Sequence, residues 1–239
     1  RYVVGVSPFL TDENKDEVFR HLVRLLLEDM PLDSSLWLYD AYHVRTVAQA
    51  AIPGSRAFRS DKTRANQFQQ PLRQMKQFLA ARHPRPAADG LDFSQAIRVP
   101  QFLDFVADNL TGPDHYLVLI LLGSPLHQDE KEPAFSMTDG YFPSDAHLTA
   151  PRERTIYGRR DQGRPLAEIA VHFGWFGDPW LSELHREKIT RFWSLYLRQQ
   201  GARPATFTAD LPTVFNAVRS DVAAPEAADR RHELDPEQT

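Results

Sequence analysis

The residues whose types best suit metal or acid–base chemistry lie in one irregular stretch, from Ser124 to Pro165. Asp139, Asp145 and His147 fall close together there, and Asp129 precedes them. Carboxylate and imidazole groups bind divalent cations and act as general acids and bases, so this set predicts a metal-dependent hydrolase or a phosphate-handling enzyme if the four side chains converge. The same segment contains Asp-Gly and Pro-Ser-Asp, which are ordinary turn sequences, and we favour turns here.

Compact catalytic motifs do not occur in the chain. The absence of cysteine excludes disulfides, thiolate metal sites and a cysteine nucleophile. No His-Glu-x-x-His helix, phosphate-cradling glycine loop or Gly-x-Ser-x-Gly turn is present. We therefore expect no catalytic residue, no metal and no cofactor, and the first hypothesis is a non-enzymatic module that binds a protein partner.

A second set of candidate residues follows the ends of predicted strands. Ligands of open α/β sheets bind outside the carboxyl ends of the strands, which predicts a binding surface that comprises Ser7, Ser124, Trp175, Asp178 and Asp210. An aromatic residue among polar groups suits recognition of a protein or peptide. Each residue also has a local alternative: the serines as turn residues before proline, Asp178 as a helix cap, Asp210 as a turn residue and Trp175 as core.

The elements that must position these residues are organised around the run from Tyr116 to Leu122. It is short, apolar and followed by Gly-Ser-Pro, which favours a strand buried on both faces and therefore helices on both sides of a sheet. The tight link through Tyr42-His43 predicts an antiparallel hairpin whose second strand lies at an edge. The other predicted strands are Tyr2 to Phe9, Ser35 to Tyr42, Val44 to Ile52, Leu166 to Phe173 and Ala205 to Thr208.

Helices are predicted between the strands from apolar residues at helical spacing. They run from the cap Thr11 toward Pro31, from Pro71 to Arg82, from Pro100 to Asn109, from the cap Asp178 to Gln200, and onward from Pro212. Leu181 and Leu184 are assigned to the apolar face of the fourth helix. This order predicts an α/β three-layer sandwich with a mostly parallel central sheet and one antiparallel edge strand.

Charge divides the chain into a neutral body and an acidic tail. We expect one domain over residues 1–219, with an insertion at about 124–165, and a disordered tail over residues 220–239. Six acids and two arginines from Ser220 onward account for the whole net charge of -4. The stretch from Arg56 to Arg85 is locally basic; we interpret it as a solvated helix surface and do not expect nucleic acid as a partner.

In element order and spacing the chain resembles the von Willebrand factor A domain family. The resemblance covers Tyr2 to Ser220 with the insertion set aside. It rests on the hairpin LWLYDAYHVRTVAQAAIP and on the strand exits VVGVSPF and LILLGSP. It implies a domain that binds its partner at the carboxyl ends of the strands.

Members of that family often bind a divalent cation there, through an Asp-x-Ser-x-Ser signature after the first strand and an Asp after the central strand. Oxygen ligands with negative charge offset the cost of dehydrating such a cation. In this chain Gly5 stands in place of the first Asp, Phe9 in place of the second Ser, and only Ser7 matches. The later Asp falls on Gly123 or Ser124. The resemblance therefore implies a degenerate metal site.

No apolar stretch approaches the roughly 18 residues that a membrane span needs, so we expect no membrane association. The chain begins with Arg1 and enters a strand at once. We interpret it as the core of a longer protein whose start, with any targeting signal, lies outside this sequence, and we favour a cytoplasmic location.

Overall fold

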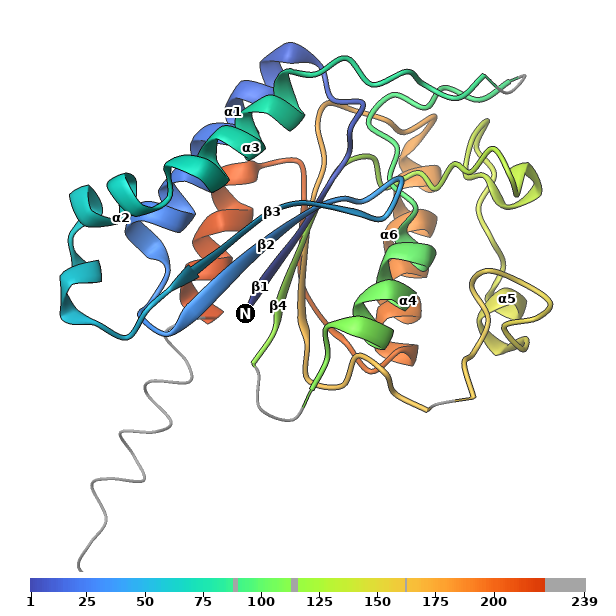
Figure 1. Ribbon diagram of the computed structural model, residues 1–239. Coiled ribbons are helices and arrows are strands. Elements are labelled where there is room, and N and C mark those ends of the chain that lie inside the picture. The colour runs from blue at the N-terminus through green and yellow to red at the C-terminus, as the bar shows by residue number, and fades with distance from the viewer. Residues whose placement is uncertain (88–89, 113–115, 162, 222–239) are drawn as a thin grey trace, which may run out of the picture.

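The centre of the molecule is a single sheet of six strands, seen nearly edge-on in the computed structural model (Figure 1). The structure describes residues 1–87, 90–112, 116–161 and 163–221. The strand order is β3-β2-β1-β4-β5-β6; neighbouring strands are parallel except β2 and β3, which pair antiparallel at one edge. The strands are β1 (Tyr2–Val6), β2 (Ser34–Asp40), β3 (Arg45–Ile52), β4 (Val118–Leu122), β5 (Ala170–Gly174) and β6 (Arg203–Thr208).

Helices cover both faces of this sheet, which confirms the predicted three-layer sandwich (Figure 1). One layer holds α1 (Asp12–Arg24), α3 (Gln69–Ala80) and the helical residues 211–221; the other holds α4 (Val99–Asn109) and α6 (Glu183–Gln199). Two short helices were not predicted from the sequence: α2 (Asp61–Gln67), which adjoins α3 in the first layer, and α5 (Asp145–Thr149), which lies outside both layers. No helix in the described part of the chain is both long and apolar enough to span a membrane.

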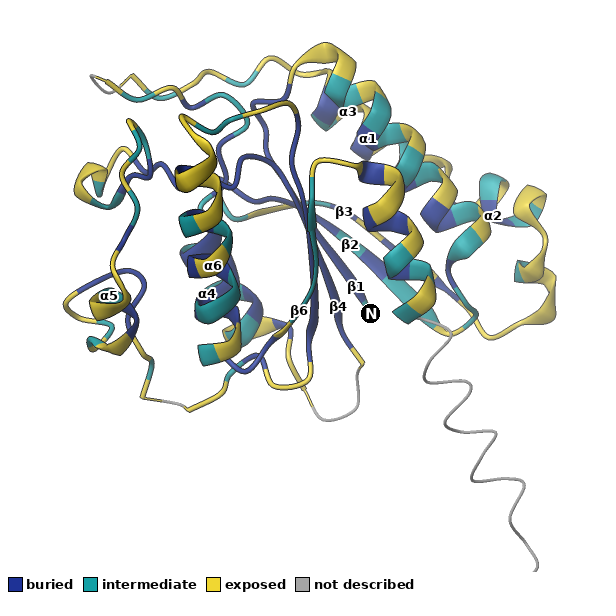
Figure 2. Ribbon diagram, turned by 180° about the vertical axis from the view of Figure 1, so that it is seen from behind, coloured by how far each residue is buried: buried dark blue, intermediate teal, exposed yellow. Residues whose placement is uncertain are grey.

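The central strands are apolar on both sides because each side supports its own core. Val4 and Val6 of β1 pack with the α1 layer, whereas Val3 packs with the α4 and α6 layer. Leu119 and Ile120 of β4 divide in the same way, and all five of these side chains are fully buried. Figure 2 shows the buried strands between helices whose outer faces are exposed. The period of two along each strand therefore places one core on each face.

The segment before α6 differs from its prediction. β5 begins at Ala170 rather than Leu166, and α6 begins at Glu183, after the N-cap Ser182, whose hydroxyl accepts the backbone N–H of His185. Asp178 is therefore not the helix cap. The prediction failed because Pro179 was taken as the first helical turn, while Ser182 supplies the better cap four residues from Asp178.

The insertion has little regular structure of its own and is held against the α4 and α6 layer. The ring of Tyr157 is fully buried and packs edge-on against Phe192 of α6, at 5.0 Å between centroids. Trp193 donates its indole N–H to the carbonyl of Pro125 at 2.8 Å. Arg152 pairs with Asp104 of α4. Aromatic packing and ion pairing thus fix the insertion against α4 and α6.

The acidic tail was predicted to begin at residue 220, but Ser220 and Asp221 belong to the last helix. Asp221 places one carboxylate oxygen 2.8 Å from Nε2 of His172 in β5 and the other 2.9 Å from Arg203 of β6. Residues 222–239, where the disordered tail is predicted, lie outside the described residues.

Candidate functional site

The strand order reverses between β1 and β4. From β1 the chain goes on to β2 on one side, and from β4 it goes on to β5 on the other, so the carboxyl ends of β1 and β4 flank a crevice. Open α/β sheets usually bind ligands in this crevice. Here the segment 93–97 fills it: Gln95 donates its backbone N–H to Phe9 at 3.2 Å and accepts that of Ser124 at 2.6 Å. Ser7 is buried beneath, with its hydroxyl accepting the N–H of Phe9 at 3.1 Å.

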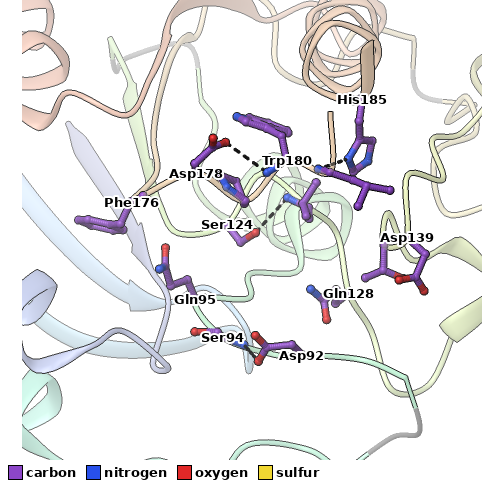
Figure 3. Close-up of a pocket in the computed structure, with 15 residues that line it drawn as sticks. Asp92, Ser94, Gln95, Ser124, Gln128, Asp139, Phe176, Asp178, Trp180 and His185 are labelled. Carbon is purple, nitrogen blue, oxygen red and sulfur yellow. Dashed lines mark hydrogen bonds between the residues drawn. The ribbon is translucent and has the colours of Figure 1, made fainter. Parts of the chain in front are cut away.

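A cavity of about 490 Å³ opens beside this filled crevice, at the carboxyl ends of β4 and β5 (Figure 3). The loop after β4, the loop between β5 and α6, the insertion and the segment 92–95 contribute its walls. It therefore brings together Ser124 and Asp178 of the predicted binding surface and Asp139 of the insertion. Its remaining lining includes Asp92, Gln95, Gln128, Phe176, Trp180, Leu181 and His185.

Trp175 and Asp210 lie outside the cavity wall. Trp175 is buried and packs edge-on against Trp180, at 5.5 Å between centroids, so it supports a residue that does line the cavity. Asp210 accepts the backbone N–H of Thr213 at 3.1 Å and so caps the helical residues 211–221. The contacts of Trp175 are those of its local alternative, a core residue, whereas Asp210 was given the alternative of a turn residue and instead caps a helix.

The four residues of the metal alternative point to different partners. Asp129 is buried and accepts the side-chain N–H of Gln101 at 2.9 Å. Asp145 is exposed on α5 and binds Arg191 with both oxygens at 2.7 Å, a contact that lowers the pKa of its carboxyl. The ring of His147 lies 3.1 Å from the hydroxyl of Thr155, and Asp139 faces the cavity. Among the described residues, no three His, Asp or Glu side chains gather as metal ligands.

His185 joins the two loops that border the cavity. Its Nδ1 accepts the backbone N–H of Leu181 at 3.3 Å, and its Nε2 lies 3.2 Å from the carbonyl oxygen of Tyr141 in the insertion. Because Nδ1 accepts, Nε2 carries the proton and donates it to that carbonyl. The buried ring thus fixes the insertion to the loop before α6.

Three exposed apolar side chains form what we call the rim of the cavity: Leu181 lines the cavity, Leu184 precedes the lining residue His185 in the chain, and Tyr141 bonds the ring of His185 through its carbonyl. Leu181 is 70% exposed, Leu184 57% and Tyr141 45%, so the prediction that both leucines face the core is wrong. The only other large apolar side chain exposed among the described residues is Tyr116, at the opposite edge of the sheet. The clustering of three of the four on one rim favours a contact surface over scattered exposure.

Sequence reasoning missed this rim because it extended α6 too far toward Asp178. In a helix starting there, Leu181 and Leu184 share the inward face with Ile189. The pair Ser182-Glu183, a capping residue followed by an acid, was the available signal that the helix begins later.

The basic stretch contains one residue that is not a surface charge. Arg64 is only 5% exposed and donates to the carbonyl oxygens of Phe58 and Leu26. Its guanidinium therefore ties α2 to the turn of helix that follows α1. The interpretation of this stretch as a solvated helix surface is therefore wrong for Arg64.

Comparison of the chain with family models, curated proteins and solved structures gave no match.

Proposed function

We propose that this chain is a non-enzymatic interaction module of von Willebrand factor A type, which binds a protein partner at the carboxyl edge of its sheet without a metal. One observation carries the proposal: the exposed side chain of Leu181 lines the cavity at the ends of β4 and β5, and two further exposed side chains, Tyr141 and Leu184, belong to residues that adjoin the lining residue His185. Exposed apolar side chains around a concave polar centre are typical of sites that bury surface against another protein.

The packing around two glycines supports the absence of a metal site. Gly5 stands where the resemblance places the first metal-binding Asp, and Gly123 is one of the two positions, with Ser124, where it places the later one. A Cβ atom at Gly5 would lie 2.5 Å from Cε1 of Phe102, and one at Gly123 would lie 2.7 Å from Cγ2 of Ile97. The space that two aspartates would need is thus occupied by core side chains.

The test compares capture of proteins by the wild-type chain and by Leu181→Asp. Because Leu181 is exposed, the charge should leave the fold intact while removing apolar contact at the rim. Tyr116→Asp is the matched control, since Tyr116 is also exposed but lies at the amino end of β4. A captured protein counts only if it binds the purified chain directly, measured by calorimetry.

We expect a direct partner whose affinity falls at least about tenfold with Leu181→Asp and is unchanged with Tyr116→Asp, because rim contacts at a buried interface contribute on this scale. A partner that binds both variants like the wild type would place the interface elsewhere and overturn the proposal. Turnover of phosphate or carboxylic esters by the purified chain would also overturn it.

A further inference from the structure

We infer that the cavity at the ends of β4 and β5 recognises an arginine side chain of the protein partner. This inference rests on the proposed function and adds the chemistry of the group that enters. It follows from three features of the wall: a buried acceptor that has no donor among the described residues, carboxylates of which two form no ion pair there, and the aromatic ring of Trp180. Figure 3 shows these residues around the cavity.

The buried acceptor is the side-chain carbonyl of Gln128. Gln128 is only 4% exposed and lines the cavity, and its Oε1 has no hydrogen-bond partner within the described residues. In Figure 3 its amide lies between Gln95 and Asp139. A buried amide oxygen without a donor costs stability, so a ligand that brings an N–H group to it gains from satisfying it.

The carboxylates give the wall its charge. Asp139 and Asp178 form no ion pair with any described residue, while Asp92 lies 3.7 Å from Arg85. Lys and Arg are absent from the lining residues, and His185 has both ring nitrogens engaged with backbone groups. The cavity is therefore negative and has unused acceptors, which favours a cationic donor over an acidic or neutral one.

The spread of the acceptors favours a guanidinium over an ammonium. The carboxylates come from separate segments, and no three described acidic or histidine side chains gather around one point. A compact ammonium needs such convergence, whereas a guanidinium presents five donors in one plane and reaches acceptors on different walls. Trp180 adds an aromatic surface on which a planar cation stacks.

The test is an NMR titration of the chain with N-acetyl-arginine amide, using the indole signals of the four tryptophans as reporters. We expect saturable shifts with a dissociation constant of about 1 mM, the range for a ligand of this size. N-acetyl-citrulline amide has the same shape without the charge and should give no saturable shift. N-acetyl-lysine amide should bind at least about tenfold more weakly, because it cannot serve separated acceptors at once.

Variants locate the site. Asp139→Asn, Asp178→Asn and Gln128→Leu should each weaken arginine binding about tenfold, the usual effect of losing a hydrogen bond to a charged group. Asp145→Asn is the matched control, since Asp145 is an exposed aspartate of the same insertion whose partner is Arg191, and it should leave binding unchanged.

Each contrary result has a separate meaning. Absence of saturable binding, equal binding of citrulline or lysine, or equal weakening by Asp145→Asn would overturn the arginine inference. If one of these results is obtained but a partner protein binds Leu181→Asp more weakly than the wild type, the arginine inference is wrong and the proposed function is not. Arginine binding without any direct protein partner would instead overturn the proposed function and leave a cation site.

Discussion

Two glycines show how single residues decide what the carboxyl edge can hold. Gly5 lies under the ring of Phe102, which is fully buried, and Gly123 lies under Ile97 and the backbone of Gln95. Any side chain at these positions must displace packed atoms. The packing at this edge therefore leaves no room for a side chain at the positions where the resemblance expects metal ligands.

Gly5→Ala should lower the free energy of unfolding by about 1–3 kcal/mol, because overpacking a filled core costs that much. The new Cβ would lie 2.5 Å from Phe102 and 3.1 Å from Cβ of Ala41. Urea denaturation measures the change. Gly112→Ala is the control, since no atom of the described residues lies within 4 Å of its Cβ position, and it should stay within about 0.5 kcal/mol of wild type. Equal stability of the two variants would contradict the packing argument.

His127 is a buried titratable residue near the base of the insertion. Its ring is fully buried, packs edge-on against Tyr157 and has no hydrogen-bond partner for either nitrogen among the described residues. Burial lowers its pKa from 6.5 to about 4; Arg98 and Arg152 act in the same direction and Asp129 opposes them. The folded chain therefore holds this ring neutral in mild acid, while the unfolded chain protonates it.

Because the folded pKa lies below the unfolded one, the stability associated with neutral His127 is complete above pH 6.5 and is lost as the pH falls toward 4. The loss amounts to about 3 kcal/mol across that window. His127→Phe removes the titration, so its stability should depend less on pH. Urea denaturation at pH 7 and pH 4.5 measures this difference for both chains, and an equal loss in both would show that His127 is not the group responsible.

At the scale of elements, the last helix, residues 211–221, is fixed to the face of the sheet that α1 and α3 cover. Asp221 contacts His172 of β5 and Arg203 of β6, and the second ring nitrogen of His172 lies 2.9 Å from the hydroxyl of Thr206. Both nitrogens of a fully buried ring are therefore satisfied, one of them by the end of the helix. This contact makes Asp221 part of the folded domain.

Asp221→Ala should destabilise the chain by about 1–3 kcal/mol, because it leaves Nε2 of His172 buried without a partner. Ser220→Ala, at the neighbouring position on the same helix, removes only a hydroxyl that donates to Asn216 and should change stability by less than about 0.5 kcal/mol. Thermal unfolding of both variants provides the measurement. If Asp221→Ala is as stable as the wild type, Asp221 does not stabilise the folded domain and the argument is wrong.

Elements with a strong local signal could be predicted from the sequence, and those decided by tertiary contacts could not. Thr11 caps α1 as expected, and the apolar run ending at Leu122 is the central strand. The start of α6 was wrong because two capping candidates compete and the burial of His185 favours Ser182. Only two of the five predicted binding residues line the cavity: residues 93–97 cover Ser7, which no signature in the sequence predicts, Trp175 is a core residue and Asp210 caps the last helix.

At the scale of the whole molecule, the cavity lies between the rigid sheet with its helix layers and the loop-rich insertion. The layers formed by the helices supply rigidity, while the insertion supplies Tyr141, Asp139 and Gln128 to the cavity and its rim. A site at the junction of a rigid sheet and a loop-rich insertion combines fixed acceptors with adaptable contacts. The central claim is that a protein binds this junction and needs no metal to do so.

The most direct test is a calorimetric titration of the purified partner into the wild-type chain, once with chelator and once with magnesium, and into Leu181→Asp. The account predicts one dissociation constant for the wild type in both buffers and an affinity at least about tenfold weaker for the variant. Binding that disappears with chelator, or that is unchanged in Leu181→Asp, would contradict it.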